Sequence, residues 1–331
     1  MPKCTIAIPV YNRCEMVRKS LESALSQKVR DLEILVVDNC STDDTWKTLN
    51  SYSDPRVRLV RNDSNLGLFG NFNRCLDLAR GQYLRFLCSD DQLSPDCINR
   101  EIKILDGHPN VALLNTRGQR VDENRNVLGI QANHLSPGIY PGLQAIHAIM
   151  WFLSHYAYNP LNYPSGILLR RDTALQAGKF DTSMRMCGDV DFFLRVLEHG
   201  NLAVSSDLGC SILVHSHQEG RKLSGDTALI KELMDLTERY RQLLEAAGAY
   251  WRIKKQFTAY ATGLAFKYWR TGLKEEVFSH RQLVKNSGVS LSETTIAVLR
   301  MFVLRMLLKI TGTRFLPVRP TWALTMKETA D

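Results

Sequence analysis

The 331-residue sequence lacks the glycine-rich loops that hold phosphates in the commonest nucleotide-binding folds. Neither G-x-G-x-x-G nor G-x-x-x-x-G-K-[ST] occurs, which disfavours a dinucleotide oxidoreductase and a P-loop phosphotransferase. The eight cysteines include no C-x-x-C pair and no zinc-ligand spacing, so we expect reduced thiols. The chain opens with MPKCTIAIPVYN, without an apolar leader segment, and we therefore expect a cytoplasmic protein.

Charge is distributed unevenly along the chain. The formal net charge is +8, and residues 241–331 hold 15 Lys and Arg against 6 Asp and Glu, so that residues 1–240 carry about −1. The length suits one catalytic domain with an appendage. We expect a catalytic domain over residues 1–225 and a helical, basic region over residues 226–331. No nucleic-acid-binding module accompanies the positive charge, so a nucleic-acid partner is not expected.

Hydrophobic periodicity alternates between the strand and the helix type over the first hundred residues. Such alternation with short links predicts an α/β fold with a Rossmann-like, mainly parallel sheet flanked by helices. Gly81 is predicted to cap one helix, and Ser94 to begin another. A less regular stretch runs from about 116 to 163, and the pattern is helical from 230 onwards. The predicted strands are 5–10, 32–37, 57–60, 83–88 and 111–115, and the predicted helices are 16–25, 42–52, 72–79 and 95–105.

Acidic residues follow two of the predicted strands. Asp38 ends the second strand, and Asp90 and Asp91 follow the fourth. Ligands of open α/β sheets bind beyond the carboxyl ends of the strands. Adjacent carboxylates supply the hard oxygen ligands that Mg²⁺ or Mn²⁺ prefers, and such an ion can bridge a diphosphate. The alternative is that the pair only forms an acidic turn ahead of a helix.

Two further carboxylates, Asp189 and Asp191, precede an apolar run with helical spacing. A carboxylate at a helix N-terminus tends to remain ionised, as a general base acting on a hydroxyl must be. Helix capping without catalysis is the competing interpretation.

Five segments together resemble glycosyltransferase family 2. The resemblance covers about residues 3–225 and implies the GT-A fold. It also implies an inverting, metal-dependent transfer of a sugar from a nucleotide-diphosphate donor, a UDP-sugar foremost, to a hydroxyl of a saccharide or lipid-linked saccharide. Polysaccharide or glycolipid biosynthesis is the expected setting. The segments are IPVYN, VVDNCSTDDT, NLGLFGNFNRCLDLARGQYLRFLCSDDQLSP, YPSGILLRRDTALQAGKFD and GDVDFFLR.

Carried over position by position, the resemblance implies a donor pocket at the ends of these strands. Asp38 would hydrogen-bond the base or the ribose, and Asp90 would lie near the ribose or the donor sugar. The remaining positions are Pro9 and Tyr11, which would pack around the base, and Asn65, Gly67 and Asn73, which would line the pocket.

The same resemblance implies a metal site and a base. Asp91 would be a direct ligand of Mn²⁺ or Mg²⁺, and His217 would complete metal or diphosphate binding, with His215 as the alternative. The family often has Glu before the base, where this chain has Gly188, so the two candidate bases are Asp189, at the family's position, and Asp191.

The C-terminal third contains the capping-box pattern of Ser290 and Glu293 ahead of a basic, apolar segment. Residues 290–315 suit a helix lying on a membrane surface, and the alternative is a helix packed on the protein with its basic residues extended. We therefore expect a cytoplasmic protein that attaches peripherally to the membrane.

Two other functions compete with transfer. A sugar nucleotidyltransferase would carry a glycine-rich, lysine-bearing loop where this chain has IPVYNRCE. A catalytically silent nucleotide-sugar or glycan-binding module is the alternative from a different class, and the retained Asp38, Asp91 and Asp189 argue against it.

Overall fold

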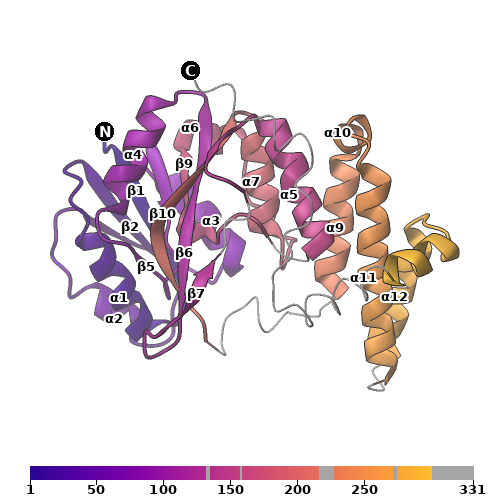
Figure 1. Cartoon of the computed structure of the whole chain (residues 1–331). Coiled ribbons are helices and arrows are strands. Elements are labelled where there is room, and N and C mark those ends of the chain that lie inside the picture. Colours follow the sequence, from indigo (N-terminus) through magenta and orange to yellow (C-terminus); the bar gives the residue numbers. More distant parts are fainter. Residues whose placement is uncertain (132–134, 157–158, 216–226, 271–273, 300–331) are drawn as a thin grey trace. The chain divides into compact units, whose positions relative to one another are not determined.

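The computed structural model describes residues 1–299 apart from 132–134, 157–158, 216–226 and 271–273 (Figure 1). Two compact units divide the chain, Met1–Ile253 and Lys254–Asp331. The domain boundary that we predicted near residue 225 falls on the segment 216–226, outside the described residues, and stays a prediction.

The N-terminal unit is built on one mixed sheet in the order β3-β2-β1-β4-β9-β6-β10-β5. Its first half is parallel and has the Rossmann-like arrangement that was predicted. Every residue of β1 and β2 is buried, as expected for parallel strands with helices on both faces. The four strands of this half are β1 (Cys4–Val10), β2 (Leu32–Asp38), β3 (Val57–Arg61) and β4 (Tyr83–Phe86).

The second half of the sheet changes direction. Strand β9 (Ile167–Arg170) lies antiparallel between β4 and β6 (Val111–Val121), while β10 (Asn201–Leu213) runs parallel to β6. Short antiparallel strands border this half, namely β5 (Gln92–Leu93), β7 (Val127–Gln131) and β8 (Gly138–Tyr140). The sequence pattern reveals buried strands but not their direction, so this reversal was not predicted.

Helices cover both faces of the sheet (Figure 1). On one face α1 (Cys14–Leu25) and α4 (Cys97–Gly107) pack on alternate residues of β1 and β2, in a core that includes Ile6, Leu21 and Ile98. On the other face α3 (Gly67–Leu78) and α7 (Gly188–Leu197) share an aromatic cluster, in which Phe180 lies with its ring centroid 4.0 Å from that of Phe192. The remaining helices of the first 200 residues are α2 (Thr45–Leu49), α5 (Gly142–Tyr156) and α6 (Arg171–Gln176).

The two helix caps predicted at Gly81 and Ser94 are wrong. Helix α3 ends with Ala79 in an extended conformation, and a Cβ on Gly81 would lie only 2.4 Å from the Thr5 nitrogen. Close approach to β1, and not a left-handed cap, therefore requires this glycine. Helix α4 begins at Cys97, after Asp96 in a left-handed conformation, so Ser94 is not its N-cap.

From α9 (Thr227–Arg239) onward the described residues are mostly helical, as predicted. Helices α10 (Arg241–Ala246), α11 (Tyr250–Arg270) and α12 (Lys274–Asn286) follow, and residues 291–299 form a further helix. The predicted capping box is confirmed, because the Ser290 hydroxyl donates to Glu293 at 2.8 Å and accepts from the Glu293 N–H at 3.3 Å. Residues 300–315 of the predicted membrane segment lie outside the described residues. Among the described helices, none is long and apolar enough to cross a bilayer.

Candidate active site

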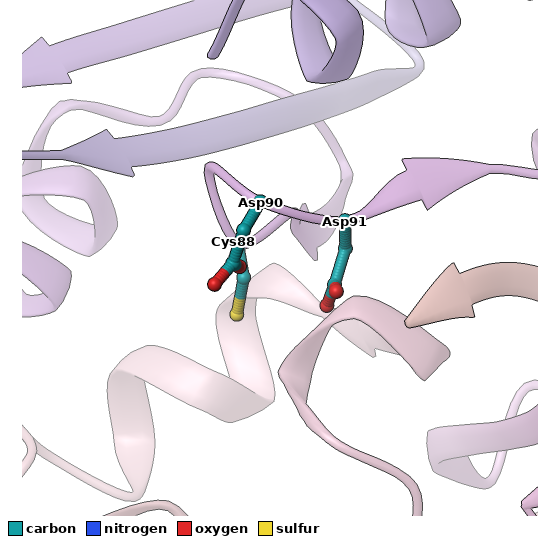
Figure 2. A group of neighbouring side chains, drawn as sticks. All are labelled: Cys88, Asp90 and Asp91. Atoms are coloured by element: carbon teal, nitrogen blue, oxygen red, sulfur yellow. The ribbon is translucent and has the colours of Figure 1, made fainter. Parts of the chain in front are cut away.

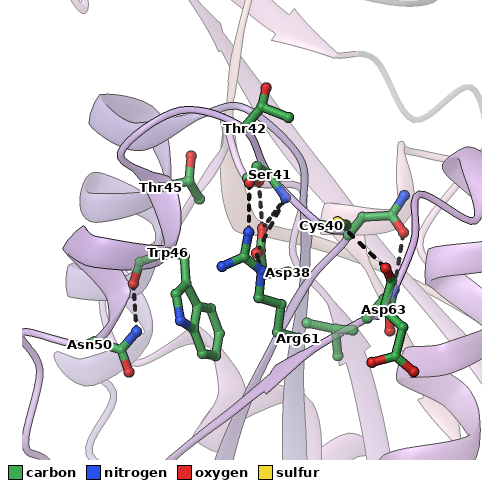
Figure 3. Close-up of polar contacts among 12 residues, drawn as sticks. Asp38, Cys40, Ser41, Thr42, Thr45, Trp46, Asn50, Arg61 and Asp63 are labelled. Atoms are coloured by element: carbon green, nitrogen blue, oxygen red, sulfur yellow. Dashed lines mark hydrogen bonds and ion pairs between the residues drawn. The ribbon is translucent and has the colours of Figure 1, made fainter.

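The loop after β2 is organised around Asp38, which is fully buried. Its carboxylate accepts hydrogen bonds from the backbone N–H and the hydroxyl of Ser41 and forms a salt bridge with Arg61 at 3.2 Å (Figure 3). The Arg61 guanidinium also lies 5.5 Å from the ring centroid of Trp46. Asp38 therefore shapes this loop, and the direct contact with a base or ribose that we expected of it stays a prediction.

The loops after β1 and β2 are joined to each other. Asn12, with a left-handed φ of 50°, donates its backbone N–H to the Ser41 hydroxyl at 3.0 Å and accepts from the Thr42 N–H at 2.8 Å. Tyr11, at the start of this junction, is 41% exposed, whereas Pro9 is buried inside β1. The aromatic ring at this sheet edge is thus available to stack on a ligand.

Asparagine side chains fix the loop between β3 and α3. Asn39 donates to the side-chain oxygen of Asn65 at 2.7 Å and to the carbonyl of Gly67 at 3.2 Å, and Gly67 has a φ of 75°. Asn73 instead exchanges two hydrogen bonds with the backbone of Phe180, at 2.9 and 2.7 Å. This pairing attaches α3 to the segment before α7, and the donor contact that we expected of Asn73 stays a prediction.

Cys88, Asp90 and Asp91 follow β4 and point to the same side of their loop (Figure 2). One thiol or carboxylate atom from each lies within 4.8 Å of the other two. Burial, followed by the charges of Asp91 and Asp90, raises the pKa of the Cys88 thiol well above its usual value. The thiol thus stays protonated, and the two carboxylates are the groups that fit a hard divalent cation.

Asp91 is buried, and Ser165 and β10 hold its two carboxylate oxygens. The Ser165 hydroxyl donates to one at 2.6 Å, and the Leu213 N–H donates to the other at 3.1 Å. Burial and the neighbouring Asp90 raise the pKa of Asp91 well above the usual range of an aspartate. The site therefore has more negative charge than its protein neighbours neutralise, which is the condition that a bound cation would relieve.

Arg125 faces this acidic pair from the turn between β6 and β7. Its Nη1 atom is buried and has no hydrogen-bond partner within the described part of the chain. Burial lowers the pKa of Arg125, and the charges of Asp91 and Asp90 oppose that effect. The Arg125 guanidinium and the carboxylates of Asp90 and Asp91 thus attract each other, and the described residues show no hydrogen bond or salt bridge between them. The sequence showed no motif at Arg125, and no signal there distinguished it from a surface arginine.

A histidine follows β10, as the family resemblance implied. The structure brings His215 to the acidic pair, where its Nε2 lies 3.0 Å from an Asp90 carboxylate oxygen. His217, the residue that we favoured, lies outside the described residues. Its role stays a prediction, and the contact of His215 makes the alternative a candidate as well.

Asp189 is the second residue of α7 and is partly buried. Burial raises its pKa to about 6, although hydrogen bonds from backbone N–H groups lower it and the charge of Glu232 adds to the rise. A pKa of about 6 leaves Asp189 ionised at neutral pH, although loss of water makes its carboxyl group less acidic than that of an ordinary aspartate. The charge of Asp189 also contributes to the raised pKa of Tyr163, after burial, and to that of Cys88, after burial, Asp91 and Asp90, so Asp189 lies within electrostatic range of the β4 loop.

Asp191, two residues later, is completely buried and paired with arginines. One oxygen accepts from Arg195 at 2.8 Å, and the other pairs with Arg239 of α9. Both oxygens are thus committed to cations within the protein. Its contacts indicate that it anchors α9 to α7, whereas Asp189 has no such ion pair among the described residues.

Gly188 packs against an aromatic ring of α3. A Cβ at this position would lie 2.5 Å from the ring of Phe69, so the ring takes the space that any side chain at 188 would need. Phe69 in turn stacks on Phe180, with ring centroids 5.8 Å apart. An aromatic residue of α3 therefore packs directly on the backbone that carries Asp189.

Part of the chain is similar in sequence to known proteins. Residues 5–161 match the profile of Glycosyl transferase family 2. The chain is 36% identical over 106 residues to UDP-Glc:alpha-D-GlcNAc-diphosphoundecaprenol beta-1,3-glucosyltransferase WfaP of Escherichia coli, covering 32% of this chain and 42% of that protein. It spans less than two thirds of the length of the curated relatives it matches first.

Solved structures show the same fold. The S. aureus TarS fragment 1–349 in complex with UDP-GlcNAc superposes with a TM-score of 0.61 at 15% identity, over 95% of this chain and 93% of that one. Mannosyltransferase PcManGT from Pyrobaculum calidifontis, in complex with GDP-Man and Mn²⁺, gives 0.53 at 15% identity, over 91% and 87%. These likenesses establish the GT-A fold of the chain.

Proposed function

We propose that this chain, whose residues 5–161 match glycosyl transferase family 2, transfers a sugar from a nucleotide-diphosphate donor to an acceptor hydroxyl with inversion at the anomeric carbon. The observation that carries the proposal is the pair of carboxylates Asp90 and Asp91 in a group with Cys88, on which the charge of Asp189 also acts. Burial and the charge of Asp90 raise the pKa of Asp91, and the third carboxylate, Asp189, has a pKa of about 6. Such an arrangement suits a cation-bound diphosphate next to a general base.

The donor would bind at the carboxyl ends of β1, β2 and β4. Tyr11 offers an exposed ring for the base, and the loop that Asp38 holds forms the adjoining wall. Asp91 and Asp90 would hold Mn²⁺ or Mg²⁺, with a histidine after β10 nearby, and the cation would supply charge neutralisation of the leaving diphosphate. A UDP-sugar is the donor that we expect, as in the complex of TarS, whereas PcManGT holds GDP-Man.

Arg125, which lies within electrostatic range of the acidic pair, would complete the proposed diphosphate site. Its buried, unpaired Nη1 and the acidic pair face each other without direct contact among the described residues. A diphosphate between them would receive a charge-assisted hydrogen bond from the guanidinium. Arg125→Ala should therefore weaken binding of UDP but not of uridine, whereas Arg117→Ala, which removes an exposed arginine from β6, should weaken neither.

Asp189 acts as the general base in this mechanism. Its carboxylate takes the proton of the acceptor hydroxyl while that oxygen bonds to the anomeric carbon. The bond from the anomeric carbon to the diphosphate oxygen breaks, and the nucleoside diphosphate leaves with the bonding electron pair. A single displacement from the face opposite the leaving group inverts the configuration.

Isothermal titration tests the donor site first. UDP, GDP and dTDP are titrated into wild type and Asp91→Ala, each with and without Mn²⁺. We expect one nucleotide to bind in a metal-dependent manner, and Asp91→Ala to lose that dependence. Asp106→Ala, which removes a carboxylate that pairs with Lys3, is the control and should bind as wild type does.

The alternative of a catalytically silent nucleotide-sugar or glycan-binding module makes a separate prediction. A silent module would bind the nucleotide but release no nucleoside diphosphate from any UDP- or GDP-sugar. Release measured with and without an acceptor, in wild type and Asp189→Asn, separates the two functions. If no nucleotide binds at all, the transferase proposal fails, and the silent module, in its glycan-binding form, is favoured.

We propose also that the basic C-terminal region brings the enzyme to the cytoplasmic face of the membrane, near a lipid-linked acceptor. Within unit 254–331 the described residues expose large apolar side chains, and basic residues accompany them in the sequence. Co-sedimentation with phosphatidylglycerol vesicles, but not with phosphatidylcholine vesicles, would support this, and a protein indifferent to both would contradict it. The exposed apolar residues are Phe266, Trp269, Phe278, Leu291, Ile296 and Leu299.

A further inference from the structure

Glu232 of α9 binds the backbone immediately ahead of α7. Its carboxylate accepts hydrogen bonds from three consecutive N–H groups, those of Arg185 at 2.7 Å, Met186 at 3.0 Å and Cys187 at 2.7 Å. The side chain is only 8% exposed. Successive N–H groups that converge on one point form an anion-binding nest, and here the anion is a carboxylate of the protein itself.

This nest lies next to the proposed base. Cys187 is the N-cap of α7, and Asp189 is two residues further on. On its other side the backbone of Gly188 is limited by the Phe69 ring, 2.5 Å from where a Cβ would be. The segment that carries the base is therefore held between an aromatic ring of α3 and a carboxylate of α9.

We propose that Glu232 is the positioning residue for Asp189: it fixes the backbone from which the base projects, and its negative charge favours uptake of the acceptor proton. This inference rests on the proposed role of Asp189 as the base. Glu232 does not contact the reacting atoms in this proposal. It acts through the segment 185–187 and through its charge, and no sequence motif distinguished it.

The electrostatic part follows from the groups that face Asp189. The charge of Asp189 acts on Cys88 of the β4 loop, on Tyr163 and on Cys187. The charge of Glu232 acts on Asp189 itself. Burial is the largest cause of the raised pKa of Asp189, and the charge of Glu232 adds to it. Removing that charge should lower the pKa of the base.

The test compares Glu232→Gln with Asp235→Asn, which removes an exposed carboxylate from the same helix. The Gln side chain has one acceptor oxygen and a donor group, so it cannot accept from all three N–H groups. We expect Glu232→Gln to lower kcat at least tenfold, to keep metal-dependent nucleotide binding, and to move the acid limb of the kcat/KM profile to lower pH. Asp235→Asn should match wild type in all three.

The outcomes separate this inference from the proposed function. Nucleotide titration and a thermal melt establish that Glu232→Gln is folded. A folded variant with wild-type kcat and an unmoved acid limb overturns the inference, provided that Asp189→Asn is inactive. If Asp189→Asn retains full activity, the assignment of the base fails, and the inference fails with it. If kcat falls while the acid limb stays where it is, the role of the charge is excluded.

Discussion

Two groups of buried aspartates in the N-terminal unit differ in what neutralises them. Asp38 and Asp191 are fully buried, and each forms a salt bridge with arginine within the protein. Asp91 and Asp189 have no arginine or lysine ion pair among the described residues, and the pKa of each is raised. We call the first group the paired aspartates and the second the open aspartates.

This difference shows which carboxylates serve the fold and which remain for a ligand. A paired carboxylate has its charge compensated before any ligand arrives, so removing it leaves a buried or half-buried arginine without its partner. An open carboxylate costs free energy when it is ionised, until a cation or a proton reaches it. Chemistry that needs a metal or a proton should therefore depend on the open aspartates.

Replacement of Asp189 should have the largest effect of all, and this effect should be on kcat. A general base contributes ~10²- to 10⁴-fold to the rate, so we expect Asp189→Asn to lower kcat by about that factor while nucleotide binding persists. The matched control is Asp191→Asn, which should lower the melting temperature but leave kcat of the folded protein close to wild type. A loss of kcat in Asp191→Asn equal to that in Asp189→Asn would falsify the division into paired and open aspartates.

The pH dependence of kcat/KM should show whether Asp189 is an open aspartate. With a pKa of about 6, Asp189 is protonated in acid and ionised at neutral pH. We therefore expect kcat/KM to be level above pH ~7 and to fall about tenfold for each pH unit below 6, measured at saturating Mn²⁺. An acid limb below pH 4 would mean that Asp189 behaves as a paired aspartate does.

The parallel half of the fold was predictable because its signals are local. Apolar runs bounded by turns located β1, β2, β3 and β4, each within two residues of its end. Strand β5, with only two residues, and the antiparallel direction of β9 depend on pairing with β10 and β4, which leaves no periodic trace. Helix α5 was missed in a stretch that we expected to be irregular.

The site was predictable only where it follows strands or matches a family pattern. Asp90, Asp91 and Asp189 belong to such motifs. Ser165 and Glu232 act through hydrogen bonds to residues 74 and 45–47 positions away in the sequence, a distance over which no pattern connects them. The choice between Asp189 and Asp191 likewise needed the arginine partners of Asp191, one of which lies 48 residues further along.

A methyl group at position 188 should displace the open aspartate Asp189 through packing alone. The Cβ of Gly188→Ala would press on the Phe69 ring, and overpacking of this kind costs about 1–3 kcal/mol. We expect a lower melting temperature, together with a lower kcat, because Asp189 follows directly. The double variant Gly188→Ala with Phe69→Leu should recover part of kcat, since the smaller side chain leaves room for the methyl group. If the double variant is no better than the single one, this contact does not limit the position of the base.

Removal of a paired carboxylate should reduce stability. Asp38→Asn loses the salt bridge with Arg61 and weakens the acceptor for the Ser41 hydroxyl and N–H. Arg61 is 39% exposed, so solvent compensates part of the loss, and we expect about 1–2 kcal/mol of destabilisation. Urea unfolding of the metal-free protein measures it. Arg61→Ala is the companion variant, and the double variant should cost less than the sum of the two single variants.

Removal of an open carboxylate should raise the stability of the protein, whereas removal of a paired one lowers it. This is the smallest of the effects that we expect. Asn at position 91 can still accept from the Leu213 N–H and can donate to the Ser165 hydroxyl, so the hydrogen bonds persist while the uncompensated charge disappears. We expect metal-free Asp91→Asn to melt about 2–4 °C above wild type, the shift that ~1 kcal/mol produces in a domain of this size. Mn²⁺ should raise the melting temperature of wild type and not that of the variant, because only wild type binds the ion tightly. A variant that melts below wild type without metal would place Asp91 among the paired aspartates, with a cationic partner that the described residues do not include.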